Sequence, residues 1–354
     1  MRTLQAILSM TFLIVLVALT SCQNAPETNY GYNPDIRAAI PTKGAPSEKL
    51  FQDVPKSYRS TTQGKRYTLK IDATVHVPDI SSCVRAYAVP RVMEDDLLIK
   101  AAFTGDLANT AIEIEEQIDG YDGNGPLYYK LFSAPDTPFS AVRNDMDASY
   151  SYSYDDITHV NIIENREKGP NASKCFLTRD EAQRLASEKA IELGFDIYDL
   201  QYAAAYGAME NSPGFYVFQY AKKYRGVKCN TFSYSTLNSI YPIFGEEMFI
   251  FVDDRGIVSL SATEYTEQEI IEENVAILSF QDMVKSVERN IEVLPIGADL
   301  TYTKIEFVYL QIPFESERYK FIYTPAWCFS VDEIINSNAM MYFFVDARTG
   351  EIIR

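Results

Sequence analysis

The sequence is poor in the residues on which most active sites depend. Its 354 residues include two histidines, His76 and His159, and a single tryptophan. A serine or cysteine nucleophile needs a base beside it, and a zinc site needs closely spaced histidines or cysteines. The chain has no H-E-x-x-H, C-x-x-C or G-x-S-x-G segment, no P-loop and no dinucleotide-binding fingerprint. We therefore predict no catalytic residues, no metal site and no cofactor.

Basic residues are scarce relative to acidic ones. Lysine and arginine together number 32 against 49 aspartates and glutamates, which gives a formal net charge of −17. Nucleic-acid binding requires clustered lysine and arginine, and electrostatic attachment to anionic lipid requires a polybasic segment. The charge balance therefore argues against a nucleic-acid partner. It is compatible with a neutral or basic partner, although a solvated acidic surface explains it more simply.

The N-terminus has an apolar run between a positive charge and a cysteine. Arg2 precedes apolar residues 4–19, and small residues lead to Cys22. This pattern is typical of a secretory signal peptide over residues 1–21, and the run is shorter than the roughly 20 residues that span a bilayer. The segment Leu19–Cys22 resembles the bacterial lipobox, which implies lipid attachment at Cys22 and an extracytoplasmic protein anchored to the cell membrane. An N-terminal anchor helix with an incidental cysteine is the alternative.

Four further cysteines are widely spaced along the chain: Cys83, Cys175, Cys229 and Cys328. An even number in an exported protein permits two disulfides in three possible pairings. Each cysteine could equally be a small buried hydrophobic residue. Cys229 and Cys328 fall at corresponding places in the internal repeat described below, which favours a shared buried position over a bond between them.

The first half of the chain divides into a tether and a folded region. Residues 22–60 are rich in proline and polar residues without a persistent period, which predicts a flexible tether. Residues 61–168 are predicted to form an N-terminal α+β domain. Within it, apolar–polar alternation predicts a strand over 66–77, which we expect to pair with a second strand over 84–89. Helical spacing of apolar residues predicts a helix over 93–103.

The second half contains an internal repeat, which predicts two tandem domains over 169–265 and 266–354. The first copy opens with Thr178 and Glu181 in capping-box spacing, followed by an apolar stripe that ends at Gly194. The second copy opens similarly at 278–282. Strands are predicted after each helix, at 200–206, 215–220 and 225–229 in the first copy and at 305–310, 319–323 and 324–329 in the second.

Each copy ends on the same hairpin signature. Asp253, Arg255 and Gly256 in the first copy correspond to Asp346, Arg348 and Gly350 in the second. Aspartate and threonine side chains bond nearby backbone amides, and glycine accepts a positive φ. The motif therefore predicts a tight turn between two strands, with no function beyond the turn.

The C-terminal half resembles PepSY-like domains, on the strength of Pro325-Ala326-Trp327 and the ending Asp346-Ala347-Arg348-Thr349-Gly350-Glu351. The resemblance covers about 175–354, and the first copy departs from it because it lacks the threonine and glutamate. It implies an α+β fold in which antiparallel sheets are each packed by a helix. Such domains occur in peptidase propeptides and in membrane-tethered regulators of two-component histidine kinases, so the resemblance implies binding or inhibition.

The expected function is therefore that of a non-catalytic cell-surface lipoprotein that binds or regulates an extracytoplasmic peptidase or sensor kinase. The alternative is a lipoprotein that binds the cell wall or a small ligand, because aromatic rings stack on sugars. Six tyrosines suggest it: Tyr198, Tyr202, Tyr206, Tyr216, Tyr220 and Tyr224. A hydrolase that uses paired carboxylates is the least favoured interpretation. Its candidate pairs are Asp95-Asp96, Asp155-Asp156, Glu246-Glu247 and Glu272-Glu273.

Overall fold

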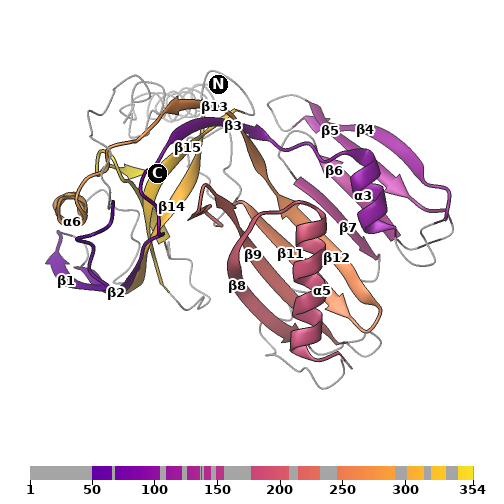
Figure 1. The fold of residues 1–354 in the computed structure, drawn as a ribbon, viewed down its shortest axis with the longest axis horizontal. Helices are drawn as coiled ribbons and strands as arrows, with labels where there is room; N and C mark the ends of the chain where they lie inside the picture. Colours follow the sequence, from indigo (N-terminus) through magenta and orange to yellow (C-terminus); the bar gives the residue numbers. More distant parts are fainter. Residues whose placement is uncertain are drawn as a thin grey trace, which may run out of the picture.

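The computed structural model shows a strand-rich chain with two sheets, one mixed and one antiparallel, and three helices among its described residues (Figure 1). The described residues are 50–65, 68–103, 109–121, 126–135, 137, 139–144, 149–154, 177–206, 214–231, 245–291, 301–314, 320–331 and 342–353. Cys22, Cys175 and His159 lie outside them, as does the predicted signal peptide. Within the described part, no helix is long and apolar enough to cross a membrane. The presence of two sheets and three helices confirms the α+β prediction in its coarse form.

The first sheet has eight strands in the order β1-β2-β14-β15-β16-β17, with β3 between β15 and β13. Its strands are β1 Ser57–Gln63, β2 Thr68–His76, β3 Arg85–Pro90, β13 Tyr265–Glu272, β14 Thr301–Pro313, β15 Phe321–Ser330, β16 Tyr342–Asp346 and β17 Ile352–Ile353. The sheet is mixed because β2 and β14 pair in parallel while the other pairs are antiparallel. The predicted strand over 66–77 is confirmed as β2.

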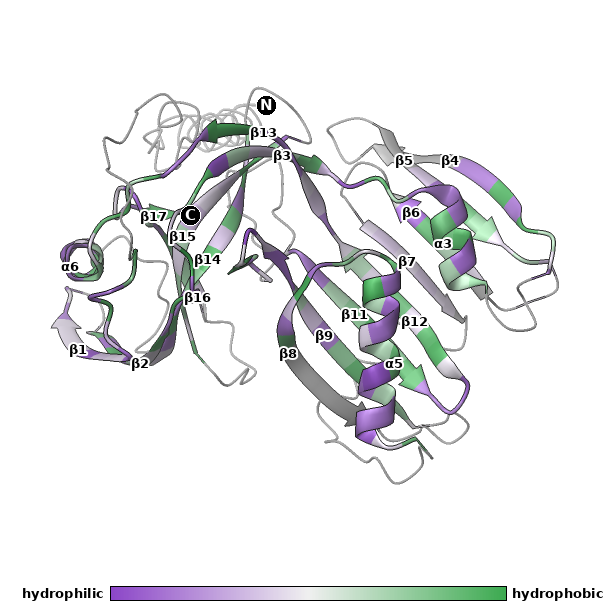
Figure 2. Cartoon of the chain, viewed as in Figure 1, coloured by the Kyte–Doolittle hydropathy of each residue, from purple (hydrophilic) through white to green (hydrophobic). Residues whose placement is uncertain are grey.

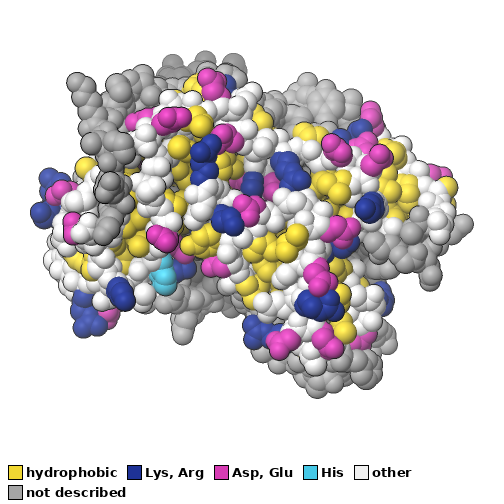
Figure 3. Space-filling model, viewed as in Figure 1, with side chains coloured by type: hydrophobic (Ala, Val, Ile, Leu, Met, Phe, Trp, Pro, Cys, Tyr) yellow, Lys and Arg dark blue, Asp and Glu magenta, His cyan; other side chains and the backbone are white. Residues whose placement is uncertain are grey.

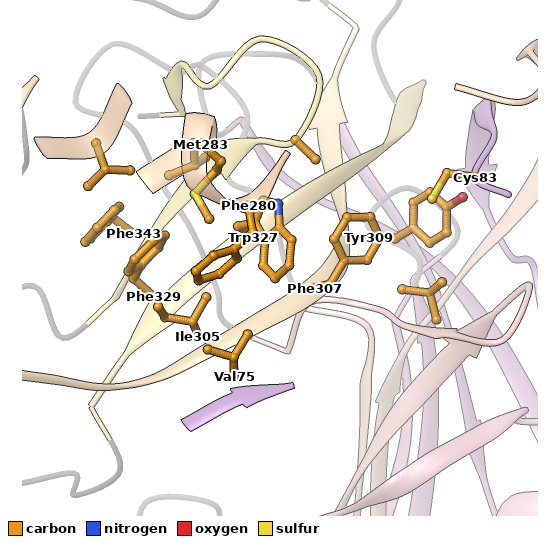
Figure 4. Packing of buried hydrophobic residues seen from close by; sticks show 14 of the residues in the cluster. Val75, Cys83, Phe280, Met283, Ile305, Phe307, Tyr309, Trp327, Phe329 and Phe343 are labelled. Carbon is orange, nitrogen blue, oxygen red and sulfur yellow. The ribbon is translucent and has the colours of Figure 1, made fainter. Parts of the chain in front are cut away.

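Helix α6 (Phe280–Arg289) packs on the eight-stranded sheet through one apolar face. The tryptophan at the centre of this core, Trp327, is fully buried, with Phe280 and Phe307 edge-on at 5.5 and 5.2 Å between ring centroids (Figure 4). Alternate β2 residues enter the same core, as the period of two along a strand requires. Aromatic edge-to-face contacts of this kind stabilise a core beyond the area that they bury.

The second sheet has nine strands, all antiparallel, in the order β10-β9-β11-β12-β7-β6-β5-β4, with β8 also paired to β9. Its strands are β4 Glu113–Tyr121, β5 Pro126–Ser133, β6 Phe139–Asn144, β7 Ser149–Tyr154, β8 Ile197–Tyr206, β9 Phe215–Tyr224, β10 Val227–Lys228, β11 Glu247–Asp253 and β12 Gly256–Thr263. Helices α3 (Asp95–Ala102) and α5 (Arg179–Glu192) contribute to one core on this sheet.

The sequence explains how α5 begins, packs and ends. Thr178 accepts a hydrogen bond from the Glu181 amide, and the Glu181 carboxylate accepts one from the Thr178 amide, which confirms the predicted capping box. Three fully buried alanines form its inner face, so the helix can lie close to the strands. Gly194 follows with φ of 74°, the left-handed conformation expected after a helix end. Much of the outer surface of α5 is hydrophilic (Figure 2).

Two strand predictions are wrong. The strand over 84–89 exists as β3, but it pairs with β13 and β15 rather than with β2. The predicted strands over 319–323 and 324–329 are a single strand, β15. Pro325 lies where the neighbour of β15 changes from β3 to β16. Its missing amide hydrogen therefore interrupts neither ladder, and the strand continues through it.

The sheets collect strands from distant parts of the chain. The segment 61–168, predicted as an N-terminal domain, provides β2 and β3 to the eight-stranded sheet and β4–β7 to the nine-stranded one. β1 begins at Ser57, within the range predicted as tether. The described strands of this segment therefore do not form a sheet of their own.

The C-terminal half contains two segments with the same order of elements. We call α5-β8-β9-β11-β12 (178–263) the first unit and α6-β14-β15-β16-β17 (279–353) the second unit; in each, a helix precedes an antiparallel meander. Val252 lies opposite Tyr216, and Val345 opposite Trp327, so Tyr216 and Trp327 occupy equivalent places.

The cysteines do not follow this equivalence. Cys328 lies within β15 opposite Phe344, whereas Cys229 follows β10 and forms a bridge with Tyr309. The predicted correspondence of the two cysteines is therefore wrong, because the first unit inserts β10 after β9 and the second has no such strand among its described residues. Cys83, Cys229 and Cys328 are buried free thiols.

Candidate functional site at the junction of the two sheets

The two Asp-x-Arg turns have the same internal bonding. Asp253 Oδ1 accepts a hydrogen bond from the Arg255 amide at 2.8 Å, and Asp253 Oδ2 accepts one from Arg255 Nη2 at 2.7 Å. Asp346 and Arg348 repeat both contacts at 2.8 Å. The Arg255 side chain is 38% exposed, however, and that of Arg348 only 1%. The repeated sequence thus gives one local geometry in two environments.

The turn of the second unit also anchors α6. Gly350 has φ of 73°, and its amide donates to the Asp346 carbonyl at 2.8 Å. Ser286 on α6 donates its hydroxyl to the Gly350 carbonyl at 2.9 Å. A Cβ at Gly350 would lie 2.9 Å from the Ser286 Cβ, so only glycine fits without displacement. Thr349 accepts from the Glu351 amide at 3.3 Å, within the turn itself.

A fully buried carboxylate, Glu246, joins the two sheets. It precedes β11, and its Oε1 accepts hydrogen bonds from Lys222 Nζ at 2.8 Å, the Tyr265 amide at 2.8 Å and the Tyr323 hydroxyl at 2.9 Å. Its Oε2 accepts one from Gln311 Nε2. Lys222 lies on β9 of the nine-stranded sheet, whereas Gln311 and Tyr323 lie on β14 and β15 of the other sheet. Glu246 therefore connects the sheets through one side chain.

A second buried carboxylate, Glu264, lies beside it between β12 and β13. Its Oε2 accepts from Arg91 Nη1 at 2.7 Å and from the Tyr150 hydroxyl at 3.0 Å. Burial raises the pKa of Glu264, and the cations Lys222 and Arg91 only partly offset this. Arg91 also donates to the Leu193 carbonyl at 3.0 Å, so the same guanidinium holds the end of α5.

Neighbouring carboxylates stabilise the protonated form of the buried Lys222 side chain. Burial alone would lower the pKa of this ammonium, but the carboxylates of Glu246 and Glu264 outweigh burial, and its pKa is raised. A protonated lysine between two carboxylates is the arrangement that buried charges require, because an unpaired buried charge is strongly destabilising. We call Lys222, Glu246, Glu264 and Arg91 the junction cluster.

Aromatic rings extend the contact between the sheets. Tyr224 on β9 stacks on Tyr323 with centroids 4.2 Å apart and meets Tyr309 edge-on at 4.9 Å. Its hydroxyl donates to the Glu267 carboxylate, which Arg225 also holds at 2.9 Å. Rings from both sheets therefore pack against one another next to the junction cluster.

A more exposed group of charges lies on three strands near the junction. Glu306 on β14 accepts from Lys228 at 2.8 Å and lies 3.0 Å from Lys304. Burial would raise the pKa of Glu306, but the two lysines outweigh burial and its pKa is lowered. Asp199 on β8, near the same lysines and His76, has a pKa raised by burial. We call Glu306, Lys228, Lys304 and Asp199 the rim cluster.

The candidate carboxylate pairs of the sequence analysis are mostly bonded to neighbours. Asp95 contacts Lys130 at 3.1 Å and Arg143, and Glu247 accepts from Gln219. Glu272 lies 3.6 Å from Arg85. Asp155 and Asp156 lie outside the described residues. Across the described part of the chain, no group of three histidines, cysteines or acidic residues could hold a metal ion.

The tyrosines of the first unit are not an exposed row where the structure describes them. Tyr216 and Tyr220 are buried beneath α5, and their hydroxyls reach the carbonyls of Leu177 at 3.2 Å and Gln183 at 3.3 Å. Sheet packing accounts for these two rings. The side chains of Tyr202 and Tyr206 lie outside the description.

Sequence reasoning missed the junction cluster. Only Glu246 was considered, and then as half of a carboxylate pair. One signal was available: Lys222 continues the alternation of β9 after the buried Phe218 and Tyr220, so its side chain is expected on the buried face. The partner strands could not be known, because they lie in distant parts of the chain.

Comparisons with known proteins concern the fold alone. No known family profile and no curated protein matches the chain. An uncharacterised protein from Eubacterium rectale ATCC 33656 is similar in structure, with a TM-score of 0.60 at 16% identity over 87% of this chain and 96% of that one. The C-terminal domain of YpeB from Bacillus megaterium, which is PepSY-like, matches at a TM-score of 0.34 and 12% identity, over 75% and 97% of the chains. A likeness that weak carries no argument.

Proposed function

We propose that the chain is a non-catalytic, lipid-anchored surface protein that binds or regulates an extracytoplasmic protein partner, a peptidase or the sensor region of a kinase. Its N-terminal sequence supports export and lipid attachment at Cys22. We further propose that the first and second units are PepSY-like repeats. Their shared element order, each a helix followed by an antiparallel meander, supports this interpretation.

The observation that carries the proposal is that both units already accept strands from elsewhere in the chain. β2 adds to β14 of the second unit, and β7 adds to β12 of the first. Strand addition to a sheet edge is a general mode of protein recognition, in which backbone hydrogen bonds give affinity and alternate side chains give specificity. A fold with this construction is suited to engage extended segments of other proteins.

The charged groups support binding rather than chemistry. The carboxylates of the junction cluster are bonded to cations inside the molecule, and on the visible face positive and negative side chains are interspersed (Figure 3). The face shown in Figure 3 has no large field of one sign, so specificity on that face would come from shape and backbone pairing. The junction cluster then fixes the relative position of the two sheets.

Photocrosslinking on intact cells tests the proposal. The lipidated chain would carry a photoreactive amino acid at exposed positions on each sheet, and captured proteins would be identified by mass spectrometry. We expect one envelope peptidase or sensor kinase to be recovered reproducibly. The matched control is Cys22→Ser, which removes the proposed lipid site and should abolish both anchoring and capture.

Other results would contradict the proposal. Recovery of the chain alone from every position would remove the protein-partner function. Recovery with glycan fragments, together with sedimentation of the purified chain with peptidoglycan, would favour the wall-binding alternative instead.

A further inference from the structure

The two units are extended at opposite edges of their sheets. In the second unit, β14 pairs with β2 on its outer side, in parallel. In the first unit, the equivalent strand β8 pairs only with β9 among the described residues. β8 therefore lies at a border of the nine-stranded sheet (Figure 1). At the equivalent place, β14 of the second unit pairs with β2, whereas β8 of the first unit has no second partner strand in the part of the chain that the structure describes.

The strand registers show which residues of β8 correspond to the β14 residues that pair with β2. Phe218 and Phe329 are equivalent, each two residues along from the equivalent pair Tyr216 and Trp327. Ala203 lies opposite Phe218, and Ile305 lies opposite Phe329. Ile305 is the residue that pairs with Val75 of β2. Ala203 is thus the β8 residue that corresponds to Ile305, at a place where the described residues supply no further strand.

The last part of β8, Tyr202–Tyr206, lacks the features that usually protect an edge strand. Exposed edges commonly carry charges, prolines or bulges that prevent pairing with other chains. β8 has register shifts up to Tyr202, but the segment Tyr202–Tyr206 pairs regularly with β9 and has neither charge nor proline. The edge strand β4 has four acidic residues, Glu113, Glu115, Glu116 and Asp119, and β13 has three, Glu267, Glu269 and Glu272.

We propose that the outer edge of β8 at Tyr202–Tyr206 receives an extended, uncharged segment of the partner protein, paired in parallel as β2 pairs with β14. This inference rests on the proposed function and names the site and mode of binding. The segment alternates apolar and polar residues, as β2 does, because only one of its faces turns towards the core beneath the helix. A second copy of this chain is disfavoured as the occupant by the net charge of −17 on each copy.

A pair of proline variants tests the edge directly. Neighbouring residues of an edge strand direct their amides alternately to the paired strand and to the open side. One of Ala203→Pro and Ala204→Pro therefore breaks the ladder to β9, whereas the other removes only an outward amide and is tolerated. Thermal unfolding identifies the tolerated variant. The same pair on β1, Ser60→Pro and Thr61→Pro, is the matched control at an edge that we do not assign.

The probe is a phage-displayed library of random dodecapeptides, selected against the full chain and remeasured as synthetic peptides. We expect the selected peptides to be uncharged and to lose about tenfold or more in affinity for the tolerated β8 variant, which corresponds to ~1.4 kcal/mol. The tolerated β1 variant should retain affinity within about twofold. Hydrogen exchange of the unmodified chain should show protection of β8 amides on peptide binding, a result that depends on no variant.

Several outcomes would overturn the assignment. They are failure to enrich any peptide, equal affinity for the tolerated β8 variant, and protection of β1 or β4 in place of β8. Dimerisation of the chain that the same proline abolishes would make a second copy the occupant. If intact cells still yield one envelope protein with the tolerated β8 variant, the proposed function stands and the edge is wrong. If peptides bind β8 but no envelope protein is captured, the edge stands and the proposed function fails.

Discussion

The first and second units begin with capped helices and end on the same Asp-x-Arg turn, yet the two turns differ in their surroundings. Arg255 keeps 38% of its side chain exposed, whereas Arg348 keeps 1%. The centres of the two cores differ as well: Trp327 lies among three aromatic rings, and Tyr216 stacks on Phe218 at 6.2 Å. Similar local sequence therefore gives similar local geometry. How much each element contributes to stability depends on the residues that pack around it.

Removal of the two equivalent core rings should give the largest difference in stability between the units. We expect Trp327→Ala to lower the free energy of unfolding by about 4 kcal/mol and Tyr216→Ala by about 3 kcal/mol, because a larger buried ring leaves a larger cavity. Urea unfolding followed by circular dichroism measures both. Trp327→Phe is the control and should recover most of the loss. Equal losses at the two positions would contradict the view that the units differ in packing.

The two Asp-x-Arg turns should give the next largest difference in stability between the units. Asp346→Ala leaves the buried guanidinium of Arg348 without its carboxylate, a loss of about 3 kcal/mol. Asp253→Ala leaves Arg255 partly in water, so we expect about 1 kcal/mol. Both values come from chemical denaturation of the full chain. The double variant Asp346→Ala, Arg348→Leu should recover stability if the unpaired charge is the cause, and no recovery would point to the turn geometry instead.

The two helix caps should differ little in their contribution to stability, because both lie on the surface. Thr178→Ala removes one side of a capping box, and Ser279→Ala removes a cap that accepts from the Asp282 amide at 3.1 Å. We expect about 1 kcal/mol for each. A loss above ~2 kcal/mol at either cap, measured by thermal unfolding, would show that the cap also orders the preceding chain.

The smallest expected effect is in pH dependence, which should have opposite signs at two carboxyls near the junction. The pKa of Glu306 is lowered, so its contribution is present above the ordinary value of 4.5 and is lost as pH falls below it. The pKa of Glu264 is raised, so its ionisation makes stability fall as pH rises from 4.5 to the raised value. Urea midpoints measured between pH 3 and 8 should depend less on pH at the acid end in Glu306→Gln. Glu264→Gln should remove a decline above pH 4.5, and the same sign for both variants would contradict the assigned shifts.

Local signals in the sequence predicted single elements well. The alternation over 66–77, the capping box at Thr178 and the glycine after α5 each correspond to an observed strand, cap or helix end. Pairing was harder to predict, as the wrong partner of β3 shows. A strand carries the same alternation whichever neighbour it has, so its sequence does not specify that neighbour.

The sequence by itself determined where helices begin and end, which strand faces are apolar and that the final turn occurs twice, because these depend on residues close together in the chain. The tertiary structure alone decided that the described strands of 61–168 are shared between two sheets and that Glu246 meets Lys222 and Tyr323. It also decided that β8 pairs only with β9 among the described strands. These features depend on contacts between distant segments, and a buried charge reveals its partner only when the sheets that surround it are assembled.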